Sequence, residues 1–248
     1  MNLETMQRYW SEDASNYGQI IEDELASFRV EAWKKFLSRQ LPHHTQDVLD
    51  FGCGPGFFSI ILADMGYTVT AIDCSAGMLK KASQLVEAAN LQDCITFYQM
   101  DVNAMTFPEN SFDAILSRNV TWTLADPRKV YSDCRQLLRP LGRLMLFDAN
   151  WHLHLYDEAL ARENNKRHED CLKQFGQDFD GPPLTEPFDP RKLPLSGVKR
   201  PYWDVEALRL AGFRNAHSYG DLTEKLWDEN HWITVGKALG ERKLTPVF

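Results

Sequence analysis

The hydrophobic positions follow two different patterns along the chain. In the first 45 residues, apolar side chains recur every three or four positions, as in amphipathic helices, and Pro42 ends this part. From Asp47 to Phe147, short apolar or β-branched runs alternate with longer segments of helical periodicity. This alternation is typical of a parallel sheet that is covered by helices on both faces. The predicted strands are Val48–Phe51, Thr68–Ile72, Ile95–Gln99, Phe112–Ser117 and Gly142–Phe147, and the predicted helices are Phe57–Met65, Ser75–Ala89 and Asp126–Leu138.

The alternation ends after residue 150. Leu155–Phe175 is predicted to be helical, because acidic and basic residues pair there at i,i+4 spacing. Residues 182–201 hold six of the 12 prolines, which predict irregular structure. Because a long irregular segment inside a compact domain is often functional, we expect residues 150–201 to form a cap or lid. A helix at Tyr202–Ala211 and two closing strands at Phe213–Tyr219 and Trp232–Gly236 are predicted to follow.

The strongest chemical motif is a glycine-rich turn between a predicted strand and a predicted helix. Residues 48–56 read VLDFGCGPG, with three glycines at alternate positions. Glycine lets the backbone turn tightly and approach a ligand closely, and the following helix begins with free N–H groups. Asp73 ends the next strand, 23 positions after Asp50, where a carboxylate can accept both ribose hydroxyls of an adenosine. The motif and this acid together predict an adenosine-containing cofactor.

The spacing of the glycines distinguishes between two such cofactors. A dinucleotide-binding turn has the spacing GxGxxG, whereas this chain has GxGxG and carries Phe57 where the third glycine would stand. Asp50, just before the turn, would repel a pyrophosphate but can receive an ammonium group. The residues therefore favour S-adenosylmethionine, and an NAD-dependent oxidoreductase is the less favoured alternative.

Five segments between Asp47 and Asp148 resemble, in order, the motifs of the class I S-adenosylmethionine-dependent methyltransferases. The last one resembles the LKPGG turn of that family, with Leu141 in place of its first glycine. The segments are Asp50–Gly56, Ala71–Leu79, Asp101–Val102, Phe112–Ser117 and Leu138–Leu144.

This resemblance implies an α/β fold with a Rossmann-like, doubly wound sheet of seven strands, the last of them antiparallel. It also implies N-terminal helices over the site and a lid inserted after the fifth strand. The chain is then expected to divide into an N-terminal helical cover, an S-adenosylmethionine-binding core, a lid or substrate insertion, and the C-terminal part of the core sheet. The corresponding ranges are 1–45, 46–149, 150–201 and 202–248.

The resemblance further implies which residues bind the cofactor. Asp50 would face the ammonium group and Asp73 the ribose. Met78 would pack on the adenine, and Asp101 with Val102 would read its edge. The full set of expected cofactor-binding residues is Tyr17, Asp50, Gly52, Cys53, Gly54, Asp73, Cys74, Met78, Asp101, Val102 and Arg118.

Methyl transfer from a sulfonium depends mainly on positioning, and a base is needed only where the acceptor has to lose a proton. Candidate bases follow the fifth strand: Asp148, His152, His154 and Tyr156. The alternative is that these side chains only pack the lid. Three tryptophans also allow two interpretations: they form a wall against a cationic or aromatic substrate, or they are part of the core. They are Trp10, Trp122 and Trp151.

Composition narrows the choice of acceptor. The 248 residues carry 27 basic and 35 acidic side chains, a net charge of −8, which disfavours a broad nucleic-acid surface. A small molecule methylated on N, O or S is therefore expected. Methylation of RNA or protein, and a non-catalytic S-adenosylmethionine-binding subunit, are kept as alternatives.

Cysteine content and apolar runs bear on the environment of the protein. The five cysteines form no CxxC pair, so reduced thiols and no metal site are expected. No apolar run approaches the ~20 residues of a membrane span, and the N-terminus does not resemble a signal peptide. We therefore expect a cytoplasmic protein without a membrane partner, in an oligomeric state that the sequence leaves open.

Overall fold

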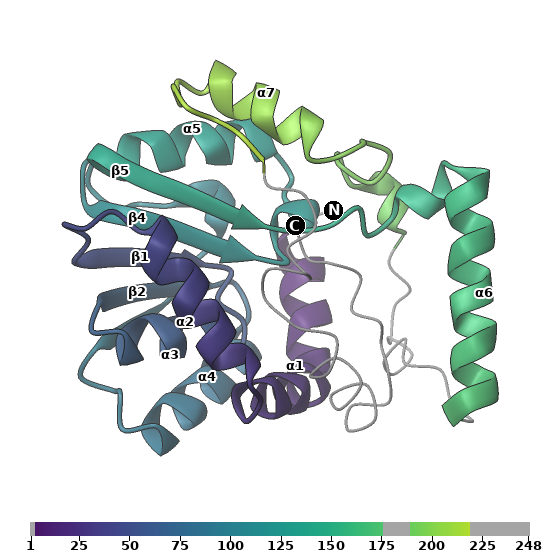
Figure 1. The fold of residues 1–248 in the computed structure, drawn as a ribbon, viewed down its shortest axis with the longest axis horizontal. Coiled ribbons are helices and arrows are strands. Elements are labelled where there is room, and N and C mark those ends of the chain that lie inside the picture. Colours follow the sequence, from purple (N-terminus) through teal and green to yellow (C-terminus); the bar gives the residue numbers. More distant parts are fainter. Residues whose placement is uncertain (1–2, 176–188, 219–248) are drawn as a thin grey trace.

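The computed structural model describes residues 3–175 and 189–218, and five strands in this part form one parallel sheet. Their order is β3-β2-β1-β4-β5, so that β1 lies at the centre (Figure 1). In the register of the sheet, Asp47 lies opposite Thr68, and Val48 lies opposite Ala114. The strands are β1 (Asp47–Phe51), β2 (Thr68–Asp73), β3 (Ile95–Gln99), β4 (Phe112–Arg118) and β5 (Leu138–Phe147).

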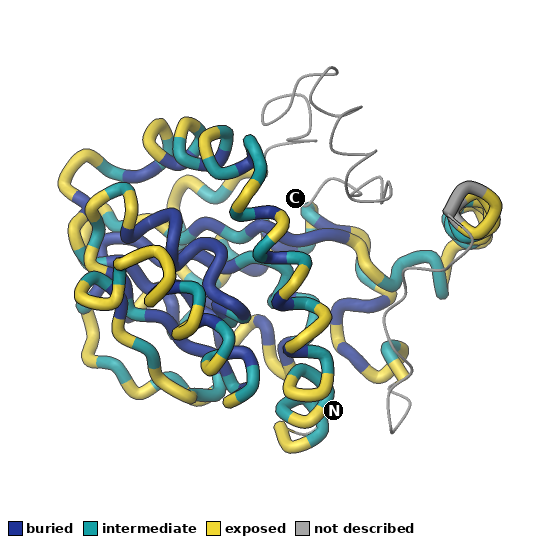
Figure 2. Tube along the Cα trace, turned by 90° about the horizontal axis from the view of Figure 1, so that it is seen from below, coloured by how far each residue is buried: buried dark blue, intermediate teal, exposed yellow. Residues whose placement is uncertain are grey.

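Helices cover both faces of the sheet. Val48 and Leu49 are neighbours in β1 but belong to different core clusters, because successive strand residues point to opposite faces. Helices α2, α3 and α4 pack on the first face, with the Trp33 ring centroid 5.0 Å from that of Phe58, and α5 packs on the second. Buried segments gather in the sheet (Figure 2). The helices are α1 (Leu3–Leu25), α2 (Arg29–Gln40), α3 (Phe57–Asp64), α4 (Ala76–Ala88), α5 (Pro127–Leu137), α6 (Glu158–Phe175) and α7 (Tyr202–Leu210).

The structure confirms the predicted parallel sheet with alternating strands and helices, with small changes in bounds. β5 begins at Leu138, four residues before the predicted Gly142. Leu141, which stands where the related family has glycine, adopts a φ of +67°. This left-handed conformation favours glycine, so the departure seen in the sequence falls at a strained position.

The C-terminal part differs from the expectation. Residues 213–218, predicted to begin the first closing strand, form turns and irregular backbone. Their backbone groups form hydrogen bonds with residues of α7 instead of with a strand. Phe213 N donates to Leu208 O at 3.0 Å, and Ala216 O accepts from Arg209. The second closing strand, Trp232–Gly236, lies outside the described residues. The sheet that the described residues form therefore has five strands, where the sequence predicted seven.

The segment after β5 contains α6 between two short 3₁₀ turns, η3 (Leu153–Leu155) and η4 (Pro190–Lys192). α6 contacts η3 and stands away from the helices that cover the sheet (Figures 1 and 2). Its role as a lid, and the division of the chain after residues 45, 149 and 201, stay predictions. Among the helices in residues 3–175 and 189–218, none is long and apolar enough to cross a membrane.

Candidate cofactor site

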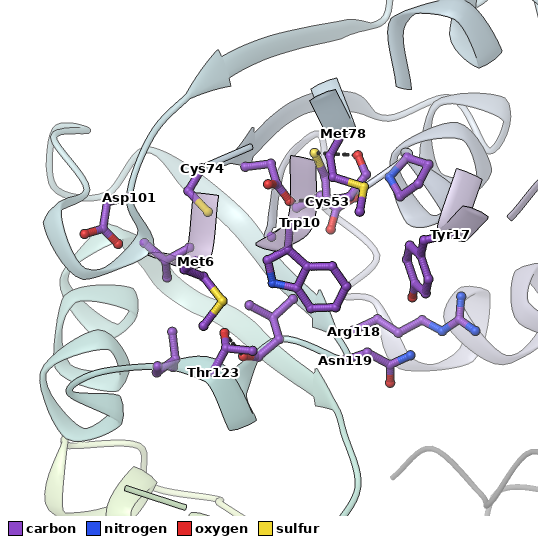
Figure 3. A pocket seen from close by; sticks show the side chains of 18 of the residues that line it. Met6, Trp10, Tyr17, Cys53, Cys74, Met78, Asp101, Arg118, Asn119 and Thr123 are labelled. Atoms are coloured by element: carbon purple, nitrogen blue, oxygen red, sulfur yellow. Dashed lines mark hydrogen bonds between the residues drawn. The ribbon is translucent and has the colours of Figure 1, made fainter. Parts of the chain in front are cut away.

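A pocket lies at the carboxyl ends of β1, β2 and β4, between these strand ends and α1 (Figure 3). This is the edge of a parallel sheet at which ligands of such folds bind. All eleven residues that the sequence predicts for cofactor binding line this pocket, which brings together residues from α1, α4, three strands, a 3₁₀ turn and the loops between them. In Figure 3, Asp101 and Cys74 lie toward one end, Trp10 lies near the middle, and Tyr17 and Arg118 lie at the other end.

The glycine turn is shaped by backbone conformations that favour glycine. Gly52, Gly54 and Gly56 have φ angles of +65°, +52° and +91°. A β-carbon on Gly52 would collide with the side chain of Val120, which itself lines the pocket. Because the turn is this tight, it presents backbone rather than side chains to the cavity.

Asp73 joins the end of β2 to this turn. Its Oδ2 accepts a hydrogen bond of 2.9 Å from Gly54 N, and its Oδ1 accepts one of 2.8 Å from Ser75 N. Burial raises the pKa of Asp73, and the backbone N–H groups that it accepts from act in the opposite direction. The carboxylate is therefore held rigidly at the edge of the pocket before any ligand arrives.

Asp50 lies at the buried end of β1. Its Oδ2 accepts a hydrogen bond of 2.6 Å from the Ser59 hydroxyl. Burial raises the pKa of Asp50 to about 7, while the bonds from Ser59 act to lower it. This value also includes the charges of Asp73, which raises the pKa, and of Arg118, which lowers it. The pocket thus has a carboxyl group on its wall whose charge changes near neutral pH.

α1 closes the pocket along its length. It is held on α4 by a hydrogen bond of 2.9 Å between the Ser11 and Ser75 hydroxyls and by an ion pair of 2.6 Å between Glu22 and Lys81. A β-carbon on Gly77 of α4 would come within 3.2 Å of α1 atoms, so glycine permits this close packing. The pocket is consequently covered by a helix that is docked to the cofactor-binding part of the chain.

Comparisons with known proteins agree with this geometry. Residues 49–146 match the family described as "Methyltransferase domain". The chain is 35% identical over 133 residues to "Putative methyltransferase YqeM" of Bacillus subtilis, covering 52% of each protein. It is 29% identical over 122 residues to the ubiquinone biosynthesis O-methyltransferase of Coxiella burnetii, covering 49% of this chain and 51% of that protein. The chain thus spans about half the length of the curated relatives that it matches.

Residues 49–146 of the chain therefore form a methyltransferase domain. A crystal structure of a "putative s-adenosyl-l-methionine-dependent methyltransferase" from Methanococcus maripaludis shares its fold, with a TM-score of 0.53 at 22% identity. That similarity covers 66% of this chain and 74% of the other. The cofactor of the domain is S-adenosylmethionine, and the NAD-dependent alternative is set aside.

The residues of the methyltransferase pocket fit this cofactor in chemistry. Met78, Cys74 and Val102 offer apolar surface suited to a flat base. The carboxyl groups of Asp73 and Asp50, which also line the pocket, suit hydroxyl and ammonium donors. In residues 3–175 and 189–218, no group of three or more His, Cys, Asp or Glu side chains is placed to hold a metal ion.

The thiols on the pocket wall of the methyltransferase domain are weakly acidic. Burial raises the pKa of Cys53 well above its usual value and that of Cys74 to about 12. Both side chains are therefore neutral thiols at physiological pH, and neither is activated as a nucleophile.

Sequence reasoning overlooked part of the cover that α1 provides. Besides Tyr17, four residues of this helix line the pocket, and they recur at helical spacing along one face. That spacing was visible in the sequence, but it indicates only a buried face and not what the face covers. The four residues are Leu3, Met6, Trp10 and Ile21, of which the sequence analysis named only Trp10, as a possible wall against the substrate.

The candidate bases of the methyltransferase do not line the pocket. Burial and, to a smaller extent, His154 lower the pKa of His152 to about 4, although Asp148 acts to raise it. Burial likewise lowers the pKa of His154. Tyr156 is exposed, and its hydroxyl donates to Arg191 O at 3.2 Å. A catalytic role for these residues stays a prediction, while their packing supports the alternative reading.

Asp148 has structural partners on both of its carboxylate oxygens. Oδ1 accepts a hydrogen bond of 2.7 Å from Trp151 Nε1. Oδ2 accepts one of 3.0 Å from Trp122 N and forms an ion pair of 3.0 Å with Arg200. Arg200 in turn pairs with Asp204 at 2.8 Å. This buried network ties the segment after β5 to the loop after β4, which favours a structural role for Asp148.

Two of the three tryptophans that could form an aromatic wall lie together. The ring centroids of Trp10 and Trp122 are 6.3 Å apart, and that of Trp122 is 5.0 Å from that of His152. Trp151 instead turns its indole toward Asp148. A row of aromatic rings therefore leads from the cofactor pocket to the segment after β5.

Proposed function

We propose that the protein transfers a methyl group from S-adenosylmethionine to N, O or S of a small-molecule acceptor. The observation that carries this proposal is the pocket beneath α1, where all eleven expected cofactor residues meet at the carboxyl ends of the central strands. The methyltransferase domain supplies the cofactor class, and the position of the pocket beneath α1 supports a small acceptor rather than a polymer.

In this proposal each end of the pocket binds one part of the cofactor. Met78 packs on the adenine, whose edge is read by Asp101 and Val102. Asp73 accepts hydrogen bonds from the ribose, since its position beside the glycine turn matches this role. Asp50, which lines the pocket before the glycine turn, receives the ammonium group.

When bound, S-adenosylmethionine supplies a methyl group that is already activated by its sulfonium. A lone pair of the acceptor forms the bond to the methyl carbon while the carbon–sulfur bond breaks and its electron pair stays on sulfur. A proton carried by the acceptor leaves to a base or to water. The residues of the chain act by orienting the two reactants and by excluding water beneath α1.

The aromatic row and the overall charge support the choice of acceptor. Trp10 and Trp122 offer flat apolar surface beside the pocket, and a net charge of −8 is unfavourable for a polyanion. The Coxiella burnetii relative is named as an O-methyltransferase of ubiquinone biosynthesis, which supports a hydroxyl on a small molecule as one such acceptor. Methylation of RNA or protein and a non-catalytic binding role are the alternatives.

A labelling experiment tests the proposal. The full chain is incubated with methyl-labelled S-adenosylmethionine and a cell extract, which is then separated by size. Label in the small-molecule fraction, absent with Gly54→Leu, is the expected result. Label in RNA or protein would contradict the acceptor class. Absence of label despite measured binding of S-adenosylhomocysteine would favour the non-catalytic alternative.

A further inference from the structure

Asn119 lines the pocket in a backbone conformation that few residues other than glycine adopt. It follows β4 directly and has a φ of +60°. Its N–H donates to Phe147 O at 2.8 Å, and its carbonyl oxygen accepts a hydrogen bond of 3.0 Å from Trp122 Nε1. Left-handed backbone at a non-glycine residue is unfavourable, and such residues gather at ligand-binding sites. Two main-chain hydrogen bonds therefore hold Asn119 at the pocket in a conformation that would otherwise be disfavoured.

The N–H side of the Asn119 amide faces Tyr17. The two side chains lie in the same part of the pocket (Figure 3). Burial raises the pKa of Tyr17, whereas Arg118 and a hydrogen bond with the Asn119 side chain act to lower it. A hydrogen bond lowers the pKa of a phenol when it is donated to the phenol oxygen. The amide nitrogen of Asn119 is therefore the atom that is directed at Tyr17, which leaves Oδ1 on the other side of the amide.

This Oδ1 atom is buried, and it accepts no hydrogen bond from the residues that the structure describes. The nearby Thr123 hydroxyl, in contrast, donates to Val120 O at 2.7 Å. A buried oxygen that accepts no hydrogen bond is unfavourable, and one on the wall of a pocket is suited to a donor on a bound ligand. Asn119 therefore offers a single accepting oxygen to a ligand in the pocket.

The surroundings of Asn119 favour the methyl acceptor, rather than the cofactor, as this ligand. The ammonium group of the cofactor is a cation, for which the carboxylate of Asp50 is a stronger partner than a neutral amide. The main chain of Asn119 is instead bonded to Trp122. The Trp122 ring lies 6.3 Å from that of Trp10 and 5.0 Å from that of His152. The amide is thus fixed to the row of rings that leads from the cofactor pocket to the segment after β5.

We propose that Asn119 Oδ1 binds the acceptor by accepting a hydrogen bond from the N–H or O–H group that becomes methylated. This inference rests on the proposed function and narrows its acceptor to amines and hydroxyl compounds, because a thiol is a weak donor and a thiolate is no donor. Oδ1 holds the hydrogen, so that a lone pair on the same nitrogen or oxygen is directed at the methyl carbon. That lone pair forms the new bond, the electron pair of the broken carbon–sulfur bond stays on sulfur, and the proton leaves to water.

The identity of the methylated atom is the first test. The full chain is incubated with S-adenosylmethionine whose methyl group carries an NMR-active carbon isotope, together with the small-molecule fraction of a cell extract. The carbon resonance of the product shows which element bears the new methyl group. We expect a methyl group on oxygen, or on a nitrogen that carried a hydrogen. A methyl group on sulfur, on carbon or on a nitrogen without hydrogen would overturn the inference.

Two variants separate the amide of Asn119 from its backbone conformation. Asn119→Gly removes the amide but tolerates the positive φ and keeps the carbonyl that binds Trp122. With a highly diluted small-molecule fraction, the initial rate is proportional to kcat/KM, and it should fall about tenfold or more in Asn119→Gly. The affinity for S-adenosylhomocysteine should stay at the wild-type value. Asn119→Asp keeps an accepting oxygen and should lose less of the rate.

Asn90→Gly is the matched control, because Asn90 is an exposed asparagine between α4 and β3 with a φ of +58°. Its rate should equal that of the wild type, and an equal loss in Asn90→Gly and Asn119→Gly would contradict the inference. An unchanged rate in Asn119→Gly would do the same. A loss of affinity for S-adenosylhomocysteine as large as the loss of rate would assign the amide to the cofactor instead. Absence of label with the wild type would contradict the proposed function itself.

Discussion

Ser59 donates a hydrogen bond of 2.6 Å to the carboxylate of Asp50 beside the glycine turn. Both side chains are buried, and Ser59 lies on α3 while Asp50 lies on β1. Burial raises the pKa of Asp50 to about 7, although the bond from Ser59 opposes this shift. The protonation state of the pocket therefore changes within the physiological range.

Cofactor binding is expected to strengthen as the pH rises through about 7. Below this pKa the free protein carries a neutral Asp50, which has to lose its proton to pair with an ammonium group. The affinity for S-adenosylhomocysteine should fall by up to about tenfold per pH unit below 7, with release of a proton on binding. Calorimetry in buffers of different ionisation enthalpy measures both quantities.

The variant Asp50→Asn is the control for this pH dependence. It should bind more weakly and with a smaller change between about pH 6 and 8, because Asp50 no longer titrates. Asp73 has a pKa raised by burial as well, and Arg118 influences Asp50, so both are left unchanged. A wild-type slope that persists in Asp50→Asn would assign the titration to another group.

Gly52→Ala is expected to lower stability and cofactor affinity by more than the cost of placing alanine at a positive φ. Alanine at positive φ costs about 1–2 kcal/mol, and the new β-carbon would also collide with Val120. Gly66→Ala is the matched control, since Gly66 has a φ of +91° but no atom within 4 Å of a β-carbon there. Urea unfolding and S-adenosylhomocysteine titration measure the difference. Equal losses in the two variants would show that the contact with Val120 relaxes freely.

Arg200→Met is expected to lower the free energy of unfolding by about 3–5 kcal/mol, as removal of one partner from a buried ion pair does. It would leave Asp148 and Asp204 buried without their shared cation. Arg191→Met is the control, because Arg191 is 60% exposed and lies 3.8 Å from Asp189, so its loss should be small. Urea unfolding gives both values. A change in Arg200→Met no larger than the control would mean that the network contributes little.

His152→Phe is expected to keep most of the methyl-transfer activity. The pKa of His152 is lowered to about 4, which makes the ring a weak base at neutral pH, and its ring packs against Trp122. Phenylalanine preserves this packing, whereas His152→Ala should raise KM for the acceptor. Steady-state kinetics on the acceptor found by labelling measure this. Loss of about 10²-fold or more in kcat with His152→Phe would identify His152 as the base after all.

The strands and helices of the methyltransferase domain could be predicted from local sequence pattern. Short apolar runs mark the strands between Val48 and Phe147 in the sequence. The three glycines of the turn indicate backbone conformations with positive φ, which few other residues adopt. The position of Asp73 after the next strand then follows from the geometry of parallel strands, whose carboxyl ends meet at one edge. Each of these features depends on residues that are close in sequence or on neighbouring strands.

Contacts between residues that are far apart in the sequence could not be predicted from local sequence pattern. Nothing near Glu24 in the sequence indicates that it shares its carboxylate with Arg118, 94 positions away. Asp148 resembled a candidate base, but Arg200 and two tryptophans occupy its oxygens. Residues 213–218 were predicted to begin a strand, yet their backbone groups bond beside α7.

The sequence alone thus determined the order of the core strands and helices, the glycine turn and the class of cofactor, because local spacing and backbone preference encode them. Only the tertiary structure decided which charges neutralise one another, which histidines remain uncharged and which face of α1 covers the pocket. The physical reason is that burial and charge pairing depend on what the folded chain brings together. The same carboxylate can be a base, a ligand for an ammonium group or half of an ion pair, according to its neighbours.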